Sequence, residues 1–291
     1  MLWIKDAHLV DPARGISGRG SLLAREGRIL KVVVGEELTA EAVLTHLGCS
    51  DLAEVAQVDG TGKYLFPGLV DAHVHLREPG QEEKEEIRSG ARAAVRGGFT
   101  SILAMANTQP VIDTRALVEF VRLEGERAGK ARVYPVAAVT KGMACKKLTE
   151  MVDLKAGGAV AFSDDGKGIQ SAEIFRLALE YAKLTGCPVI SHCEDTSLAG
   201  TGVMRKGVHS ARLGLKGIPA SAESAMVARD ALLAGETGGR LHIAHVSTKE
   251  SVQLIRAAKE AGVDITAEVN PHHLLFADED VSLTNTSYKV N

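Results

Sequence analysis

The stretch Asp71-Ala72-His73-Val74-His75-Leu76-Arg77 directly follows the apolar run Tyr64–Val70. The run is typical of a buried strand, and alternate side chains of an extended segment point to the same side. We therefore expect His73 and His75 to project together from a strand end, where two imidazoles can bind one zinc or similar first-row ion. Asp71 can orient one of them. The same spacing also occurs on surfaces without a metal, so ligands elsewhere must decide.

From residue 65 onward, short apolar segments alternate with amphipathic ones. The predicted strands are Leu65–Asp71, Thr100–Ala106, Arg132–Val139, Ala159–Phe162, Pro188–His192, Arg240–His245 and Asp264–Glu268. The predicted helices lie near residues 81–97, 113–129, 146–156, 170–185, 221–236 and 248–261, and several of them end at glycine. This alternation predicts a parallel α/β sheet whose strands are joined by crossover helices.

Polar side chains follow the carboxyl ends of several different predicted strands. An open sheet gathers its ligands at one crevice, whereas a barrel collects residues from every strand onto one face. The spread favours a (β/α)8 barrel of the TIM type over residues 65–291, with about seven of its eight strands present. We expect the chain to be truncated, although completion by a second chain or a fold without closure would also leave seven strands.

Residues 1–64 follow a different pattern. Short apolar stretches at Leu2–Ile4, Ser21–Ala24 and Ile29–Val34 are separated by turn residues, which indicates a small β-domain. Residues 36–56 are expected to form a helical insert. The chain is therefore expected to contain a β-domain, residues 1–64, and a barrel domain, residues 65–291.

The composition excludes several classes of protein. The net charge of −3 argues against a nucleic-acid binder with a basic surface. No apolar run approaches the roughly 20 residues that span a membrane, and the first residues lack the apolar core of a signal peptide. The four cysteines form no Cys-x-x-Cys pair, so a disulfide framework is not expected. We expect a cytoplasmic protein.

Further candidate ligands follow three other predicted strands. Asp164-Asp165-Gly166 follows one, and His192 and His245 end two more. Four histidines and a carboxylate, each set at a strand end, fit two ions about 3.5–4 Å apart that share the carboxylate. Zinc lowers the pKa of bound water to about 7, which provides a nucleophile at neutral pH. The alternative is a set of unrelated polar residues, which the positional rule for barrels disfavours.

Several stretches together resemble the bacterial type of dihydroorotase, one of the cyclic amidohydrolases. They are His73-Val74-His75-Leu76-Arg77-Glu78-Pro79-Gly80, Met105-Ala106-Asn107-Thr108, Phe162-Ser163-Asp164-Asp165-Gly166, Ser191-His192-Cys193-Glu194-Asp195 and Ile243-Ala244-His245-Val246-Ser247-Thr248. The first is highly specific, the others moderately so. The resemblance implies a metal-dependent hydrolase barrel beside a small β-sandwich domain.

The resemblance also implies roles for individual residues. His73 and His75 would bind one Zn²⁺, His192 and His245 a second, and Asp165, chosen over Asp164 from its place in the motif, would bridge them. Arg77 and Asn107 would hold the substrate carboxylate, with His75 beside them, and Asn291 would touch the substrate ring. The family's catalytic Asp, in a Ser/Thr-Asp-x-Ala-Pro-His motif, has no match in the sequence.

The implied activity is reversible hydrolysis of (S)-dihydroorotate to N-carbamoyl-L-aspartate in pyrimidine (UMP) biosynthesis. A homodimer is expected, and aspartate carbamoyltransferase is a candidate partner. Alternatives are a hydantoinase or allantoinase, or a catalytically silent dihydroorotase-like partner of aspartate carbamoyltransferase. Arg77 and Asn107 suit a substrate with a carboxylate, and all five candidate ligands are retained, which disfavours these alternatives.

Four further residues are given structural roles. His272 and His273 are expected to cap the last predicted strand by hydrogen bonding, with the lining of the site by one of them as the less favoured alternative, and His242 is expected to be structural or on the surface. Cys193 adjoins His192, but strand alternation points its side chain the other way.

Overall fold

The computed structural model describes residues 1–288, and the chain divides into two compact units, Met1–Leu69 and Val70–Asn291. The first unit is a small β-domain. Its strands are β1 (Leu2–Asp11), β2 (Ile16–Arg25), β3 (Arg28–Val34), β4 (Ala56–Asp59) and β5 (Tyr64–Leu65). In the described residues they form one mixed sheet, with β1 and β2 antiparallel and β4 and β5 parallel to β1.

A helical insert contributes to the core of this first unit. Helix α1 (Ala40–Leu47) begins where the Thr39 side chain accepts a hydrogen bond from the Ala42 N–H. Its buried residues Val43 and Leu47 pack with Trp3 and Leu23 of the sheet. The expected helical insert between residues 36 and 56 is therefore present but short.

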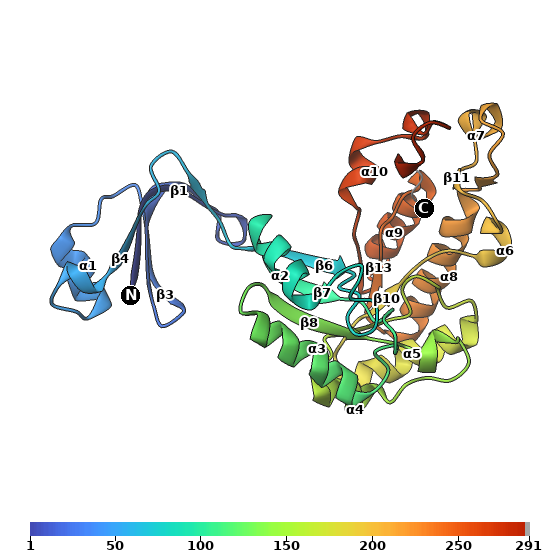
Figure 1. Ribbon diagram of the computed structural model, residues 1–291, viewed down its shortest axis with the longest axis horizontal. Coiled ribbons are helices and arrows are strands. Elements are labelled where there is room, and N and C mark those ends of the chain that lie inside the picture. Colours follow the sequence, from blue (N-terminus) through green and yellow to red (C-terminus); the bar gives the residue numbers. More distant parts are fainter. Residues whose placement is uncertain (289–291) are drawn as a thin grey trace. The chain divides into compact units, whose positions relative to one another are not determined.

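The second unit contains a seven-stranded sheet in the order β14-β13-β10-β9-β8-β7-β6. Its strands are β6 (Leu69–Val74), β7 (Phe99–Ala104), β8 (Arg132–Ala137), β9 (Ala161–Ser163), β10 (Val189–Ser191), β13 (Leu241–Ile243) and β14 (Ile265–Ala267). The registered pairs from β7 to β14 are all parallel. The sheet is curled (Figure 1). Its end strands are β6 and β14.

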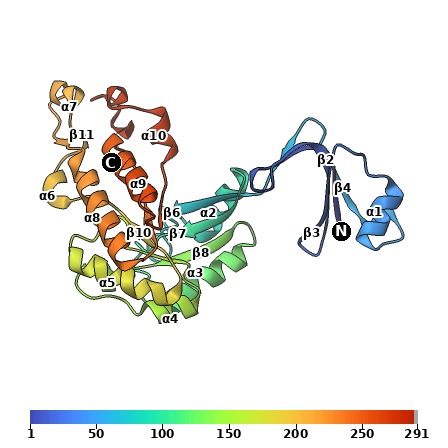
Figure 2. The ribbon, with the colours of Figure 1, turned by 180° about the vertical axis from the view of Figure 1, so that it is seen from behind.

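Helices alternate with the strands and cover the outer face of the sheet (Figures 1 and 2). They are α2 (Ile87–Arg96), α3 (Arg115–Ala128), α4 (Met151–Gly157), α5 (Ala172–Ala182), α8 (Ser221–Thr237) and α9 (Lys249–Glu260). Local signals set their ends: Ser171 caps α5, and α4 stops at Gly158, whose φ of 115° suits glycine. The predicted alternation of strands and helices is confirmed.

The two faces of the curled sheet carry separate apolar clusters. Outward side chains such as Phe162 and Leu241 pack with Phe175 and Leu179 of α5 in the main core. Inward side chains form a smaller cluster of Met105, Val136, Ala161, Ile190 and Ala244. Alternation along each strand divides the residues between the faces, as expected for a barrel with a filled interior.

Two short excursions depart from this alternation. Between β10 and α8 the chain forms α6 (Thr196–Ala199), β11 (Met204–Arg205), α7 (Val208–Arg212) and β12 (Gly217–Ile218). After β14 it forms α10 (Pro271–Leu275). No helix among residues 1–288 is long and apolar enough to cross a membrane.

The first predicted strand of the barrel was misplaced by several residues. Leu65 belongs to β5, which pairs with β1, and the barrel strand β6 runs from Leu69 to Val74. His73 therefore lies within the strand, and His75 directly follows it. The apolar run contains both β5 and the start of β6. The spacing of apolar residues does not show where one strand ends and the other begins.

Two predicted helices begin later than the sequence suggested. Helix α2 begins at Ile87, whose N–H donates to the Glu78 carboxylate over 2.8 Å, so the whole acidic run of residues 82–86 precedes the helix. Helix α4 begins at Met151, because Thr149 N–H instead donates to the Val139 carbonyl in a loop contact. In both cases a tertiary hydrogen bond overrides local propensity.

Candidate metal centre

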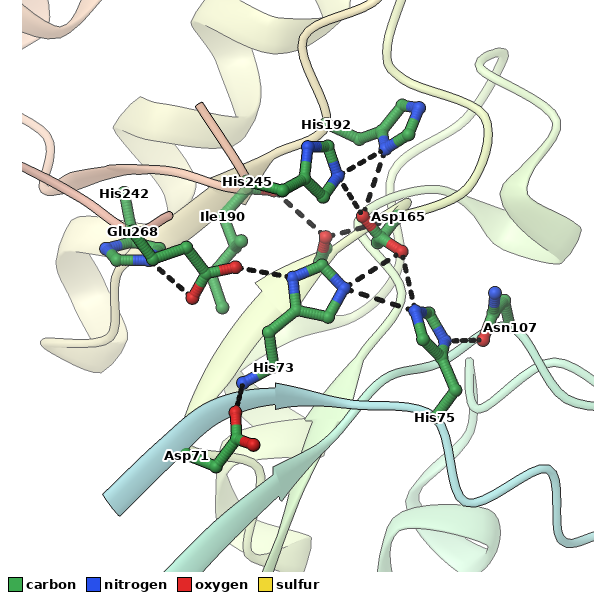
Figure 3. Close-up of polar contacts among 11 residues, drawn as sticks. Asp71, His73, His75, Asn107, Asp165, Ile190, His192, His242, His245 and Glu268 are labelled. Carbon is green, nitrogen blue, oxygen red and sulfur yellow. Dashed lines mark hydrogen bonds and ion pairs between the residues drawn. The ribbon is translucent and has the colours of Figure 1, made fainter. Parts of the chain in front are cut away.

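The five predicted metal ligands meet at the carboxyl ends of four strands (Figure 3). His73 and His75 come from β6 and the residue after it, and Asp165 lies two residues beyond β9. His192 directly follows β10, and His245 lies two residues beyond β13. Parallel strands bring their carboxyl ends to one edge, so residues up to 172 positions apart in the sequence gather there.

Asp165 is at the centre of this group. Its Oδ2 lies 3.3 Å from Nε2 of His73 and 3.3 Å from Nε2 of His75. Its Oδ1 lies 3.1 Å from Nδ1 of His192 and 3.3 Å from Nε2 of His245. Each oxygen of one carboxylate, only 3% exposed, thus faces one pair of histidines.

The donor set fits two metal ions that share a carboxylate. Two groups of three possible ligands share Asp165: His73 and His75 complete one, and His192 and His245 complete the other. Within each pair the imidazole nitrogens face each other, 3.2 Å apart in the first and 2.8 Å in the second. Nitrogen and carboxylate oxygen are ligands that zinc and other first-row divalent ions accept.

The neighbouring Asp164 is turned away from the histidines. Its Oδ1 accepts hydrogen bonds from the N–H groups of Val139 and Thr140 at 2.8 and 3.0 Å, and its Oδ2 accepts one from the Thr140 hydroxyl. Asp164 therefore holds the loop after β8, and Asp165 faces the centre. Successive side chains at a strand end point to opposite sides, which accounts for the division between the two aspartates.

The charges of the centre reinforce one another. Burial on its own would raise the pKa of Asp165, but hydrogen bonds from His192, His245 and His73 outweigh it and hold the pKa well below its usual range. Burial lowers the pKa of His73, yet its hydrogen bonds to Asp165 and Glu268 raise it to about 9. Burial lowers the pKa of His75. Shifts of this kind are typical of functional sites.

Two residues outside the predicted site, Glu268 and His242, lie behind His73. Oε1 of Glu268 is 2.6 Å from Nδ1 of His73, and Oε2 is 3.2 Å from Nε2 of His242. The prediction that His242 has only a structural or surface role overlooked this contact. Alternation along β13 and β14, which places His242, Thr266 and Glu268 on the inner face, is the signal that could have found it.

The structure places two of the residues predicted to bind substrate, Arg77 and Asn107, in the lining of the same cavity as His75. Asn107 lies beside His75, with its Oδ1 2.8 Å from the imidazole Nδ1. Arg77 lines the same cavity and adopts a left-handed φ of 61°. Asn291 lies outside the described residues.

Comparison with known proteins identifies the family. The sequence profile described as Dihydro-orotase-like matches residues 62–251. This chain belongs to the dihydro-orotase-like family. The resemblance noted in the sequence is thereby confirmed.

Relatives of this family are similar along the whole chain. A dihydroorotase from Anaeromyxobacter dehalogenans is 46% identical over 293 residues, and one from Pelotomaculum thermopropionicum is 51% identical over 290 residues. Both alignments cover 100% of this chain but only 65% and 64% of the relatives. The chain thus spans just under two thirds of the length of these relatives.

Solved structures confirm the barrel fold. An L-hydantoinase (dihydropyrimidinase) from Arthrobacter aurescens matches with a TM-score of 0.75 and 20% identity, over 96% of this chain and 60% of that protein. A D-hydantoinase from Bacillus sp. AR9 matches with a TM-score of 0.72 and 20% identity, over 99% of this chain and 61% of that protein. At this identity the likeness concerns the fold.

In this member of the dihydro-orotase-like family, two loop contacts hold the second pair of histidines. Gly168 has a φ of 60°, and a Cβ there would lie 2.6 Å from the His192 carbonyl oxygen, so the loop after Asp165 packs directly on the loop at His192. The Glu223 carboxylate accepts hydrogen bonds from the N–H groups of Ser247 and Thr248 at 2.9 and 3.1 Å. The second contact fixes the loop just after His245.

The five candidate ligands line a cavity of about 1260 Å³. His272 and His273 also line it, as part of α10, and Nε2 of His272 is buried without a hydrogen-bond partner among residues 1–288. The predicted strand-capping role is therefore wrong for His272. Cys193 Sγ faces Ser191 and Asp230, away from the histidines, as alternation predicted.

Proposed function

We propose that this chain carries the metal centre of a dihydroorotase, which hydrolyses (S)-dihydroorotate reversibly to N-carbamoyl-L-aspartate in pyrimidine (UMP) biosynthesis. The observation that carries the proposal is the sharing of one buried carboxylate, Asp165, between two pairs of histidines. The names of the relatives that align along the whole chain support this substrate.

We propose Zn²⁺ as the metal, with two ions per chain. His73 and His75 would hold one ion, His192 and His245 the other, and Asp165 would touch both. When bound, such a pair of ions lowers the pKa of water toward neutrality and polarises a carbonyl group, which is the chemistry that hydrolysis of a ring amide needs. The protein positions the ligands before binding, because their nitrogens already face Asp165.

Arg77 and Asn107 are suited to hold the carboxylate of the substrate. Arg77 is half-buried and lines the cavity, and its guanidinium makes no hydrogen bond or ion pair within residues 1–288. The Asn107 amide uses its oxygen on His75 and keeps its N–H groups available. Both residues line the same cavity, and a guanidinium and an amide can each donate charge-assisted hydrogen bonds to a carboxylate.

The proton that must reach the leaving nitrogen is a separate requirement. A carboxyl group whose pKa lies near neutrality can take up a proton and deliver it to the leaving nitrogen. None of the described residues is assigned to it, and Asp165 and Glu268 are both engaged with histidines.

The test is hydrolysis by the natural full-length protein with measured metal content. We expect about two Zn²⁺ per chain and turnover of dihydroorotate in preference to hydantoin and allantoin. Arg77→Lys should raise KM for dihydroorotate far more than it lowers zinc content, because a lysine cannot form the paired contact. Dihydroorotate left unchanged at full metal occupancy would refute the proposal.

The same measurements separate the alternatives. Preferred turnover of hydantoin or allantoin would indicate another cyclic amidohydrolase. A protein without bound metal would indicate a silent partner of aspartate carbamoyltransferase. We further propose, from the family resemblance, a cytoplasmic homodimer that can associate with aspartate carbamoyltransferase, which molecular-mass measurements with and without that enzyme would test.

A further inference from the structure

A chain of side-chain contacts runs from the metal centre to the last strand of the sheet (Figure 3). His73 Nδ1 lies 2.6 Å from Glu268 Oε1, and Glu268 Oε2 lies 3.2 Å from His242 Nε2. The second ring nitrogen of His242, Nδ1, lies 2.8 Å from the Thr266 hydroxyl. His73, Glu268 and His242 have side chains only 8, 17 and 15% exposed.

These contacts determine which ring nitrogens carry hydrogen. An ionised carboxylate only accepts hydrogen bonds, so both nitrogens that face Glu268 must donate. His73 therefore carries hydrogen on Nδ1, and His242 carries hydrogen on Nε2. With Nδ1 of His73 committed to Glu268, Nε2 is the nitrogen left to face Asp165 and His75. Only a nitrogen without hydrogen can bind a metal ion.

We propose that Glu268 and His242 are positioning residues that hold His73 in the Nδ1–H form, with its Nε2 aimed at the metal. This inference rests on the proposed function only in assuming that a metal binds there. Carboxylates that accept from the second nitrogen of a ligating histidine orient the ring and raise its basicity. His242 in turn prevents the Glu268 carboxylate from rotating, because it engages the other oxygen.

The two histidines of the His-x-His pair are thus supported differently. His73 has a carboxylate behind it, whereas His75 has the neutral amide of Asn107. The charged partner makes the stronger hydrogen bond and the more basic ligand. We therefore expect His73 to contribute more than His75 to binding of the first ion.

The contact between His73 and Glu268 also joins the two end strands of the sheet. His73 lies on β6 and Glu268 follows β14, and these are the end strands of the seven-stranded sheet, 195 residues apart in sequence. The orientation of His73 as a metal ligand therefore depends on a side chain that follows the opposite end strand of the sheet. Loss of Glu268 should weaken metal binding without touching any ligand directly.

The experiment compares zinc affinity in full-length wild-type protein and in Glu268→Leu, Glu268→Gln, His242→Leu and His242→Gln, measured by competition with a chelator. We expect Glu268→Leu to lose 10- to 100-fold in affinity for one of two ions, as loss of such partners does. Glu268→Gln should recover part of this, because its amide oxygen can still accept from His73. His242→Gln should likewise bind zinc more tightly than His242→Leu, because the glutamine amide can donate a hydrogen bond to Glu268.

Asp264→Asn is the matched control. Asp264 lies four residues before Glu268, its side chain is 62% exposed, and it pairs only with Arg240 among the described residues. Its loss should leave zinc affinity unchanged. A nitrogen NMR spectrum of the zinc-loaded protein should show His73 with hydrogen on Nδ1, a signal that a merely structural role for Glu268 would not require.

Clear results would overturn the inference. Wild-type affinity in both Glu268→Leu and His242→Leu, or equal losses in the Leu and Gln variants of each residue, would do so. A wild-type protein that binds no zinc would overturn both this inference and the proposed metal centre. Normal zinc binding with no hydrolysis of dihydroorotate would overturn the proposed function alone, and the affinity series would still decide the role of Glu268.

Discussion

Asn107 and His75 are joined by a hydrogen bond of 2.8 Å between the amide Oδ1 and the imidazole Nδ1. The amide oxygen can only accept, so Nδ1 of His75 carries hydrogen and Nε2 is free to bind a metal. The amide N–H groups remain available to a substrate. Asn107 thus contacts the proposed metal ligand His75 through its amide oxygen and offers its amide N–H groups to the proposed substrate site.

The two roles of Asn107 can be separated by Asn107→Asp. The carboxylate still accepts from His75, so we expect zinc content to stay at the wild-type level. It loses the donor and adds a charge that repels a substrate carboxylate, so KM should rise by about 30-fold or more, equivalent to about 2 kcal/mol. Asn107→Leu, the comparison variant, should lose both properties. An unchanged KM in Asn107→Asp would remove Asn107 from the substrate site.

The raised pKa of His73 predicts how the stability of the metal-free protein depends on pH. Hydrogen bonds to Asp165 and Glu268 overcome the effect of burial and raise the pKa to about 9 from 6.5. The folded protein therefore holds this proton more tightly than the unfolded chain does. The stabilisation is complete below pH 6.5 and is lost as the pH rises through about 9, for a total of about 3 kcal/mol.

Urea unfolding of the metal-free protein between pH 6.5 and 9.5 measures this loss. His73→Gln lacks the titrating group, so its unfolding free energy should fall much less over the same interval. Zinc binding should strengthen over that interval, because the ion displaces the proton. A wild-type profile that is flat from pH 6.5 to 9.5 would contradict the assignment.

Much of the fold followed from local sequence. Alternating apolar segments predicted the seven strands, because each strand of a parallel sheet is buried on both faces and leaves a continuous apolar run. Asp165 and the four histidines around it were predicted as a group because they follow strands, and strand ends of a barrel converge. The choice between Asp164 and Asp165 came from the motif; the structure shows its physical basis in the contacts of Asp164 with Val139 and Thr140.

The missed features depend on contacts between distant segments. Glu268 is 195 residues from His73, and no local pattern distinguishes it from other carboxylates at strand ends. His245 has a left-handed φ of 36°, so its side chain departs from the alternation that places His242 and Ala244 inward. The start of β6 was misjudged because β5 pairs with β1. Each case requires knowledge of what lies opposite the residue.

Arg229 and Asp230 form an ion pair beneath Ser191, the residue directly before His192. Removing Arg229 tests how much this pair stabilises the fold. The Arg229 guanidinium lies 2.7 Å from Oδ1 of the fully buried Asp230, whose Oδ2 accepts from the Ser191 hydroxyl over 2.6 Å. Arg229→Met would leave that charge buried and unpaired, so we expect a loss of about 3–5 kcal/mol in unfolding free energy. Urea denaturation measures it.

Two comparison variants make the Arg229 result specific. The double variant Arg229→Met/Asp230→Leu should recover part of the loss, because no buried charge remains but the Ile169 and Gln170 carbonyls still lose their contacts with the guanidinium. Arg176→Met removes an arginine whose pairs with Glu180 and Glu236 are exposed, so it should cost less than about 1 kcal/mol. If Arg229→Met were as mild as Arg176→Met, the Arg229–Asp230 pair would not support this part of the barrel.

A comparison of Gly168→Ala with Gly142→Ala isolates the effect of close packing between the loops of the site. The φ values of the two glycines are nearly the same, 60° and 61°, so a change to alanine imposes the same backbone strain of about 1–2 kcal/mol at each. A Cβ at Gly142 meets no atom within 4 Å, whereas one at Gly168 would lie 2.6 Å from the His192 carbonyl oxygen.

Backbone oxygen cannot move aside as a flexible side chain can, so Gly168→Ala must push the loop after Asp165 away from His192. We expect Gly142→Ala to lower unfolding free energy with no change in zinc affinity. Gly168→Ala should lower it further and weaken zinc binding by about tenfold or more, because Asp165 and His192 are proposed to bind the same ion. Equal effects of the two changes on zinc affinity would mean that contact between these loops does not set the geometry of the centre.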